Sequence, residues 1–111
     1  MQSDLNRLTE AFEYLKSNGF NIDAPLNWGF YFMDKSKKKL ASLFEELKEK
    51  NYTLEAIYKA DSKYKEWILH VSKIDTLTPE KLHRRNIAFN ELADYCDVEF
   101  YDGWDVERIK T

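Results

Sequence analysis

The chain has 111 residues, a mass of 13.3 kDa and a net charge of -3, which favours one domain with one modest core. Three tryptophans, seven tyrosines and seven phenylalanines, against three glycines and two prolines, exclude a disordered or collagen-like chain. The acidic balance disfavours a nucleic-acid backbone as partner. The single cysteine, Cys96, leaves no internal disulfide, and no apolar stretch reaches the roughly 20 residues that span a bilayer. We therefore expect a soluble, cytoplasmic protein that makes no contact with membranes.

Two stretches in the first half carry apolar residues at helical spacing. Residues 4–18 predict an amphipathic helix, with Ser3 as its N-cap and Gly19 at the position of a left-handed C-terminal cap. A second helix is centred on residues 40–47 and stops at Asn51, a residue type that tolerates the left-handed conformation.

The second half begins with two alternating segments, residues 52–58 and 67–72, which should pair as a hairpin across the polar link 59–66. Thr78-Pro79 then provides an N-cap followed by proline at the first helical position. Apolar residues from 82 to 96 lie on one arc of the third helix that this predicts.

Two further segments have strand character. The aromatic run at residues 28–33 is rich in residues that favour strands, and residues 98–101 alternate before an expected turn at Asp102-Gly103. After the leading helix, the order is therefore β-α-β-β-α-β. This order predicts an α+β, ferredoxin-like sandwich: a four-stranded antiparallel sheet with the first and third strands central and two helices on one face. We expect residues 1–27 to form the helix and connector, and 28–111 the sandwich domain.

Alternation along the strands assigns side chains to the two faces of the sheet. The more apolar sets are expected beneath the helices, namely Trp28, Phe30, Phe32, Tyr52, Leu54, Ala56, Trp67, Leu69, Val71, Val98 and Phe100. The opposite face would then carry Tyr31, Met33, Glu55, Ile57, Ile68, His70, Glu99 and Tyr101. A bulky face without its own helices indicates a foreign partner, a second copy of the chain, or cover by the leading helix.

Residues that would support catalysis are sparse. His70 and His83 have no partners at zinc-like spacing, and no phosphate-binding or nucleophile motif occurs, so we expect neither a metal nor a cofactor. Asp102 and Asp105 could be read as an acid/base pair, but solvated acids beside a tight turn explain them as well. We expect a non-enzymatic protein. RNA binding, with bases stacked on Tyr31 and His70, stays an alternative.

Negative charge is concentrated near the C-terminus. Between Glu91 and Glu107 there are seven acidic residues and no lysine or arginine. An acidic edge of this kind can steer a basic segment of a partner, although it also serves solubility.

The segment Asp97-Val98-Glu99-Phe100-Tyr101-Asp102-Gly103-Trp104 is similar to the closing motif of the RraB family, the regulators of ribonuclease activity B or ribonuclease E inhibitors. The run Gly29-Phe30-Tyr31-Phe32, and Leu43-Phe44-Glu45-Glu46-Leu47 followed by Asn51-Tyr52, also resemble that family's first β-α-β unit. The resemblance covers about residues 28–105.

The resemblance implies a ferredoxin-like fold and a cytoplasmic bacterial protein that binds an endoribonuclease of the ribonuclease E type and reduces RNA cleavage, without catalysis of its own. An immunity protein that neutralises a cognate toxin is the alternative among such binding proteins. The candidate partner-binding residues are Tyr31, Ile57, Ile68, His70, Glu99, Tyr101, Asp102, Gly103, Trp104 and Asp105.

Overall fold

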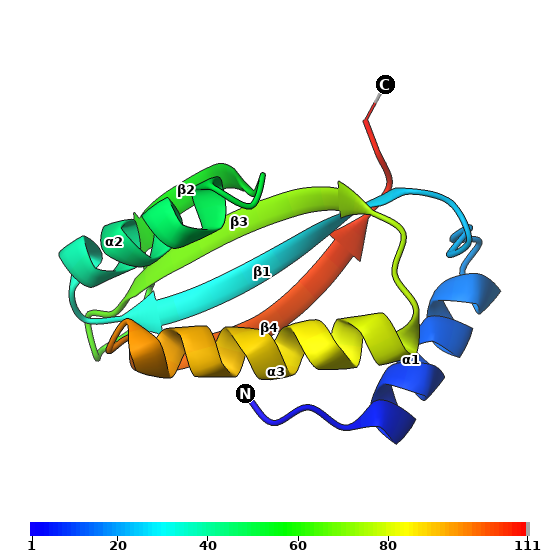
Figure 1. The fold of residues 1–111 in the computed structure, drawn as a ribbon, viewed down its shortest axis with the longest axis horizontal. Helices are drawn as coiled ribbons and strands as arrows, with labels where there is room; N and C mark the ends of the chain where they lie inside the picture. The colour runs from blue at the N-terminus through cyan, green and yellow to red at the C-terminus, as the bar shows by residue number, and fades with distance from the viewer. Residues whose placement is uncertain (111) are drawn as a thin grey trace.

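The computed structural model describes residues 1–110 as three helices and four strands (Figure 1). The elements in chain order are α1 (Leu5–Ser17), β1 (Leu26–Asp34), α2 (Lys37–Lys48), β2 (Thr53–Lys59), β3 (Trp67–Asp75), α3 (Pro79–Tyr95) and β4 (Phe100–Glu107). Within these residues, no helix combines the length and the apolar character that crossing a membrane requires.

The four strands form one antiparallel sheet in the order β2-β3-β1-β4. The predicted central position of the first and third strands is confirmed, as is the hairpin between β2 and β3. β1 pairs with β3 along its full length, from Leu26 opposite Asp75 to Asp34 opposite Trp67. The register therefore fixes which side chains of the two central strands share a face.

Helices α2 and α3 lie across the same face of the sheet (Figure 1). The side chains beneath them are fully buried: Trp28, Phe30, Phe32, Leu69 and Val71. Phe89 of α3 lies at the centre of this core. The centroid of its ring is 5.0 to 5.6 Å from the ring centroids of Phe30, Phe32, Tyr52 and Tyr101. Aromatic packing therefore holds α3 to the sheet.

Helix α1 packs on the helix side of the molecule, against α3. Its Leu8 and Phe12 are buried, and the Phe12 ring stacks on Trp28 at 5.6 Å. Of the three alternatives for the opposite face of the sheet, cover by the leading helix is therefore excluded. The physical reason is that the inner face offers the large indole of Trp28 as a stacking partner.

The N-cap of α1 is Asp4, not the predicted Ser3. The Asp4 Oδ1 atom accepts hydrogen bonds from the backbone N–H groups of Asn6 and Arg7, at 2.9 and 3.2 Å. Ser3 instead contacts α3, where its hydroxyl lies 2.8 Å from His83 Nδ1 and accepts a bond from Asn86. The predicted left-handed residues Gly19 and Asn51 are confirmed, with φ of 86° and 68°.

The last strand is longer than the sequence predicts. It does not end at Asp102-Gly103 but continues through these residues to Glu107. The register shifts there, with Phe32 opposite Tyr101 and Tyr31 opposite Gly103, so that Asp102 is an extra residue in a β-bulge. Gly103 adopts a φ of 129°, which favours glycine.

The bulge places Tyr101 and Trp104, which are three residues apart, on the same face of the sheet. Tyr101 pairs with Phe32 and Trp104 with Phe30, so both candidate residues face the helices. Tyr101 is only 1% exposed, whereas Phe100, expected in the core, is 54% exposed on the opposite face. The assignment of Tyr101 to the uncovered face is therefore wrong.

A second bulge corrects the assignment of β2. Leu54 lies opposite Val71 and Ala56 lies opposite His70, which leaves Glu55 as the extra residue. Beyond this point Ile57 pairs with Leu69 and packs against the core, although it was expected on the uncovered face. Ala56 and Tyr58 take the uncovered positions instead.

Candidate functional site

The candidate site lies on the sheet face opposite α2 and α3, which we call the open face. At its centre, Tyr31 of β1 lies opposite His70 of β3 and Gly103 of β4. Two residues earlier in β1, Gly29 lies opposite Asp105. Adjacent partners in a sheet point to the same face, so the register brings Tyr31, His70 and Asp105 together. We call these three residues the Tyr-His-Asp cluster.

The cluster is held by stacking and by a hydrogen bond. The rings of Tyr31 and His70 are stacked, with centroids 4.3 Å apart and planes 15° from parallel. The Tyr31 hydroxyl donates a hydrogen bond of 2.7 Å to Asp105 Oδ2. Side chains from all three neighbouring strands β3, β1 and β4 are therefore joined on one surface.

Gly29 makes room for this arrangement. A Cβ atom at this position would overlap Asp105 Oδ1 and would lie only 2.9 Å from His70 Nε2. The absent side chain allows the carboxylate and the imidazole to lie over the backbone of β1. The cluster thus explains why a glycine occupies the middle of a central strand: a side chain at position 29 would displace Asp105 and His70.

The environment keeps Tyr31 protonated. Burial raises the pKa of the Tyr31 phenol strongly, and its hydrogen bond to Asp105 and the negative charge of that carboxylate raise it further. Tyr31 therefore acts as a donor that orients Asp105 and not as a base. Among the described residues, no group of three or more His, Cys, Asp or Glu side chains is arranged to hold a metal ion.

Substituting Asp105 by asparagine should lower the pKa of Tyr31 toward its ordinary value near 10, because the nearby negative charge is lost. Absorbance at 295 nm as a function of pH measures this ionisation. The raised folded-state pKa stabilises the wild-type protein fully below pH about 10, and this contribution is lost as the pH rises further. In a Tyr31→Phe background the same Asp105 substitution should leave the titration curve unchanged; a shift there would contradict the assignment.

Gly29→Ala should displace Asp105 and His70 and break the Tyr31 hydrogen bond. Gly29→Ala should lower the free energy of unfolding by about 1 kcal/mol less in an Asp105→Ala background than in the wild type, because the obstructing carboxylate is then absent. Urea unfolding of the wild type, both single variants and the double variant measures this coupling. Additive effects would show that the two positions do not contact each other.

An apolar row borders the cluster and crosses all four strands. Met33 lies opposite Phe100 on β4 and Ile68 on β3, and Ile68 lies opposite Tyr58 on β2. Phe100 and Tyr58 are 54% and 42% exposed. These four residues, which we call the apolar row, form an uncovered hydrophobic strip beside the polar cluster.

The structure thus brings together part of the predicted set. Tyr31, Ile68, His70, Gly103 and Asp105 lie on the open face. Ile57, Tyr101 and Trp104 lie on the helix side, and Trp104 packs near Trp28 at 5.8 Å.

Two predicted residues flank the face at the beginning of β4. Glu99 and Asp102 are exposed there, and the Glu99 backbone N–H bonds to Asp34. Tyr58 was missed because the bulge at Glu55 turns it outward. Phe100 was missed because β4 begins only at Phe100, so the alternation expected from the buried Val98 does not continue into the strand.

The seven acidic residues do not form one edge. Asp97 forms an ion pair with Lys39, with a distance of 2.8 Å between Oδ2 and Nζ. That hydrogen bond lowers the pKa of Asp97 and raises the pKa of Lys39. Asp105 and Glu107 instead lie on the open face, opposite Gly29 and Asn27. The negative charge on this face therefore comes from the last part of β4 and from Glu55, which was predicted there and accepts a hydrogen bond from the Ser72 hydroxyl.

Comparison with known protein families matches residues 6–106 to RraB, described as "Regulator of ribonuclease activity B". The matched range begins in α1 and ends in β4, so it includes the open face, the helix layer and the leading helix. A search of curated proteins found no match to this chain. Because the match covers nearly the whole chain, this protein belongs to the RraB family of regulators of ribonuclease activity.

Proposed function

We propose that this protein regulates an endoribonuclease of the ribonuclease E type by binding to it through the open face, without catalysing a reaction itself. The observation that carries the proposal is the uncovered apolar row beside the Tyr-His-Asp cluster. Membership of a family of ribonuclease regulators supports the class of partner. The position of α1 on the helix side supports it as well, because this helix leaves the open face uncovered.

The fold proposed for this activity is the ferredoxin-like sandwich. The order β-α-β-β-α-β after α1 and the central position of β1 and β3 support this assignment. Strands of nine residues are about 30 Å long and four strands about 19 Å wide. The flat area of such a face, about 570 Å², is below the roughly 800 Å² that each partner of a standard interface buries, so the ribonuclease would also contact side chains at the rim of the sheet.

The two parts of the open face would contribute differently to binding. The apolar row would supply the buried centre of the interface, where large side chains carry most of the binding energy. Asp105 and Glu107 would meet basic groups of the ribonuclease, which favours rapid and specific encounter. The hydrogen bond from Tyr31 already orients the Asp105 carboxylate, so this group would lose little freedom when it binds a basic group.

The test is a reconstituted cleavage assay. The purified full chain should bind a purified ribonuclease E-type enzyme and slow its cleavage of a fluorescent RNA substrate. Ile68→Arg, on the apolar row, should strongly weaken both effects, whereas Ile87→Arg, on the exposed side of α3, should retain them. Normal inhibition by Ile68→Arg would refute the use of the open face, and absence of binding by the wild type would refute this class of target.

RNA binding is the competing function for the same face, since stacked Tyr31 and His70 rings offer a platform for a base. The Asp105 carboxylate at the Tyr31 hydroxyl argues against it, because it would repel the phosphates. The RNA substrate alone, titrated at low salt, distinguishes the two. Binding that is lost in Tyr31→Ala would favour the RNA alternative.

The immunity-protein alternative makes the same use of the open face but requires a toxin as partner. Pull-down with the full chain from its native cells distinguishes the two protein partners. Recovery of a toxin without any nuclease or RNA-processing protein would favour the immunity function over the ribonuclease regulator.

A further inference from the structure

A groove of about 880 Å³ lies between α2 and α3, on the opposite side of the sheet from the open face. We call it the helix groove. Its apolar lining is formed mainly by Leu47, Tyr52, Leu77, Phe89 and Leu92. The volume is in the range of sites that bind small molecules, and an apolar lining with a few polar groups is typical of them.

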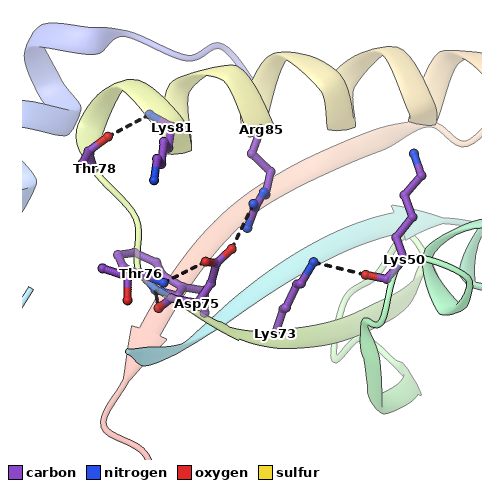
Figure 2. A network of polar contacts seen from close by, with 8 residues as sticks. Lys50, Lys73, Asp75, Thr76, Thr78, Lys81 and Arg85 are labelled. Atoms are coloured by element: carbon purple, nitrogen blue, oxygen red, sulfur yellow. Dashed lines mark hydrogen bonds and ion pairs between the residues drawn. The ribbon is translucent and has the colours of Figure 1, made fainter. Parts of the chain in front are cut away.

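Basic side chains gather at one end of the helix groove. Lys81, Arg84 and Arg85 come from the first half of α3, and Lys50 follows α2. Figure 2 shows Arg85 reaching from α3 toward the end of β3, while Lys73 points across to the backbone of Lys50. The groove lining thus has four basic residues against three acidic ones, which are Glu46, Asp75 and Glu91.

Asp75 is already fully engaged by its neighbours. Its Oδ2 atom accepts a bond of 3.1 Å from Arg85 Nη2, and its Oδ1 atom accepts one of 2.8 Å from the Thr76 backbone (Figure 2). Lys50, Lys81 and Arg84 form no ion pair with any of the described residues. The groove lining therefore keeps a formal excess of one positive charge, and an anion would compensate its unpaired cations.

Arg85 also has unused hydrogen-bonding capacity. Its Nη1 atom is buried and has no hydrogen-bond partner among the described residues. A guanidinium has five N–H donors, and a buried donor without an acceptor is destabilising. A carboxylate or phosphate that entered the groove beside Arg85 would supply the missing acceptor with a small movement of the side chain.

We propose that the helix groove binds a small amphipathic anion. Its apolar body lies against Tyr52 and Phe89, and its carboxylate or phosphate group lies at Arg85, Lys81 and Arg84. The groove is separate from the open face, so this proposal does not depend on the proposed regulation of a ribonuclease.

Four probes test the chemistry on the ¹⁵N-labelled full chain by NMR titration: octanoate, octyl phosphate, 1-octanol and inorganic phosphate. Both octyl anions should shift the amide signals of Tyr52, Arg85 and Phe89. Octanol and inorganic phosphate should each bind at least about tenfold more weakly, because each lacks one of the two contacts. The tighter of octanoate and octyl phosphate identifies the preferred head group.

Two variants test the location. Lys81→Gln combined with Arg84→Gln should weaken binding of the tighter anion about fivefold, because two exposed cations are removed. Lys35→Gln combined with Lys38→Gln removes the same charge from exposed positions outside the groove and should leave affinity unchanged. Ala88→Trp should fill the groove and abolish binding, whereas Ala41→Trp on the exposed surface of α2 should not.

Several results would overturn the proposal. Equal affinity for octanol and octanoate would show that the basic end takes no part. Equal affinity for inorganic phosphate and octyl phosphate would show that the apolar lining takes no part and that the groove is only a charged patch. Shifts confined to the open face, unchanged binding in Ala88→Trp, or no binding of either octyl anion at millimolar concentration would each refute a site in the helix groove.

Discussion

Ile68→Arg is expected to weaken binding to the ribonuclease by about 30- to 1,000-fold, corresponding to about 2–4 kcal/mol at a central interface position. Ile68 occupies the middle of the apolar row, between Met33 on β1 and Tyr58 on β2. An arginine there brings a charge into the part of the interface that excludes water. Isothermal titration calorimetry with the purified enzyme measures the change.

Ile87→Arg is the matched control for this prediction. Ile87 is an exposed isoleucine on α3, 44% accessible, and it belongs to the helix layer. The two variants make the same chemical change, but only one of them alters the open face. Both should unfold at temperatures close to that of the wild type, because the new side chains can extend into water. Equal losses of affinity in the two variants would contradict binding through the open face.

The open face and the helix layer use aromatic residues for different purposes. Beneath the helices, Trp28, Phe30 and Phe32 are fully buried and stabilise the fold. On the other side of the same strand, Tyr31 is held by His70 and Asp105 but stays partly accessible. Strand β1 therefore links the core to the proposed binding surface directly, because successive residues point to opposite faces.

Much of the fold could be predicted because its signals are local. Helical spacing and the caps at Gly19, Asn51 and Thr78 placed the helices, and alternation identified the β2–β3 hairpin. The side on which α1 packs could not be predicted in this way. Both faces of the sheet offered apolar residues, and the choice depends on the contact between Phe12 and Trp28.

The candidate site was predicted only in part, because two β-bulges interrupt the alternation and because β4 begins only at Phe100, after the Val98 from which its alternation was counted. Each bulge adds one residue to a strand and reverses the face of everything beyond it. Asp102-Gly103 carried a signal, but the same pair is also typical of a turn that ends a strand. Leu54-Glu55-Ala56 carried none. Tyr31, Ile68 and His70 were placed correctly because β1 and β3 pair without interruption.

Phe89→Ala is expected to lower the free energy of unfolding by about 3–5 kcal/mol. The ring is 6% exposed and contacts four other aromatic rings, so its removal leaves a cavity that the packed neighbours cannot fill. Tyr95→Ala provides the control, because it removes an aromatic ring from the same helix at a position that is 81% exposed. Tyr95→Ala should change the free energy of unfolding, measured with urea, by no more than about 0.5 kcal/mol.

The two classes of variant should separate stability from binding. At low temperature, where enough Phe89→Ala protein stays folded, its folded fraction should bind the ribonuclease with wild-type affinity, because α3 lies behind the sheet and the open face is unchanged. Ile68→Arg should show the opposite behaviour, with stability retained and affinity lost. If folded Phe89→Ala protein lost affinity while Ile68→Arg retained it, the ribonuclease would have to bind the helix layer, and the open face would need another explanation.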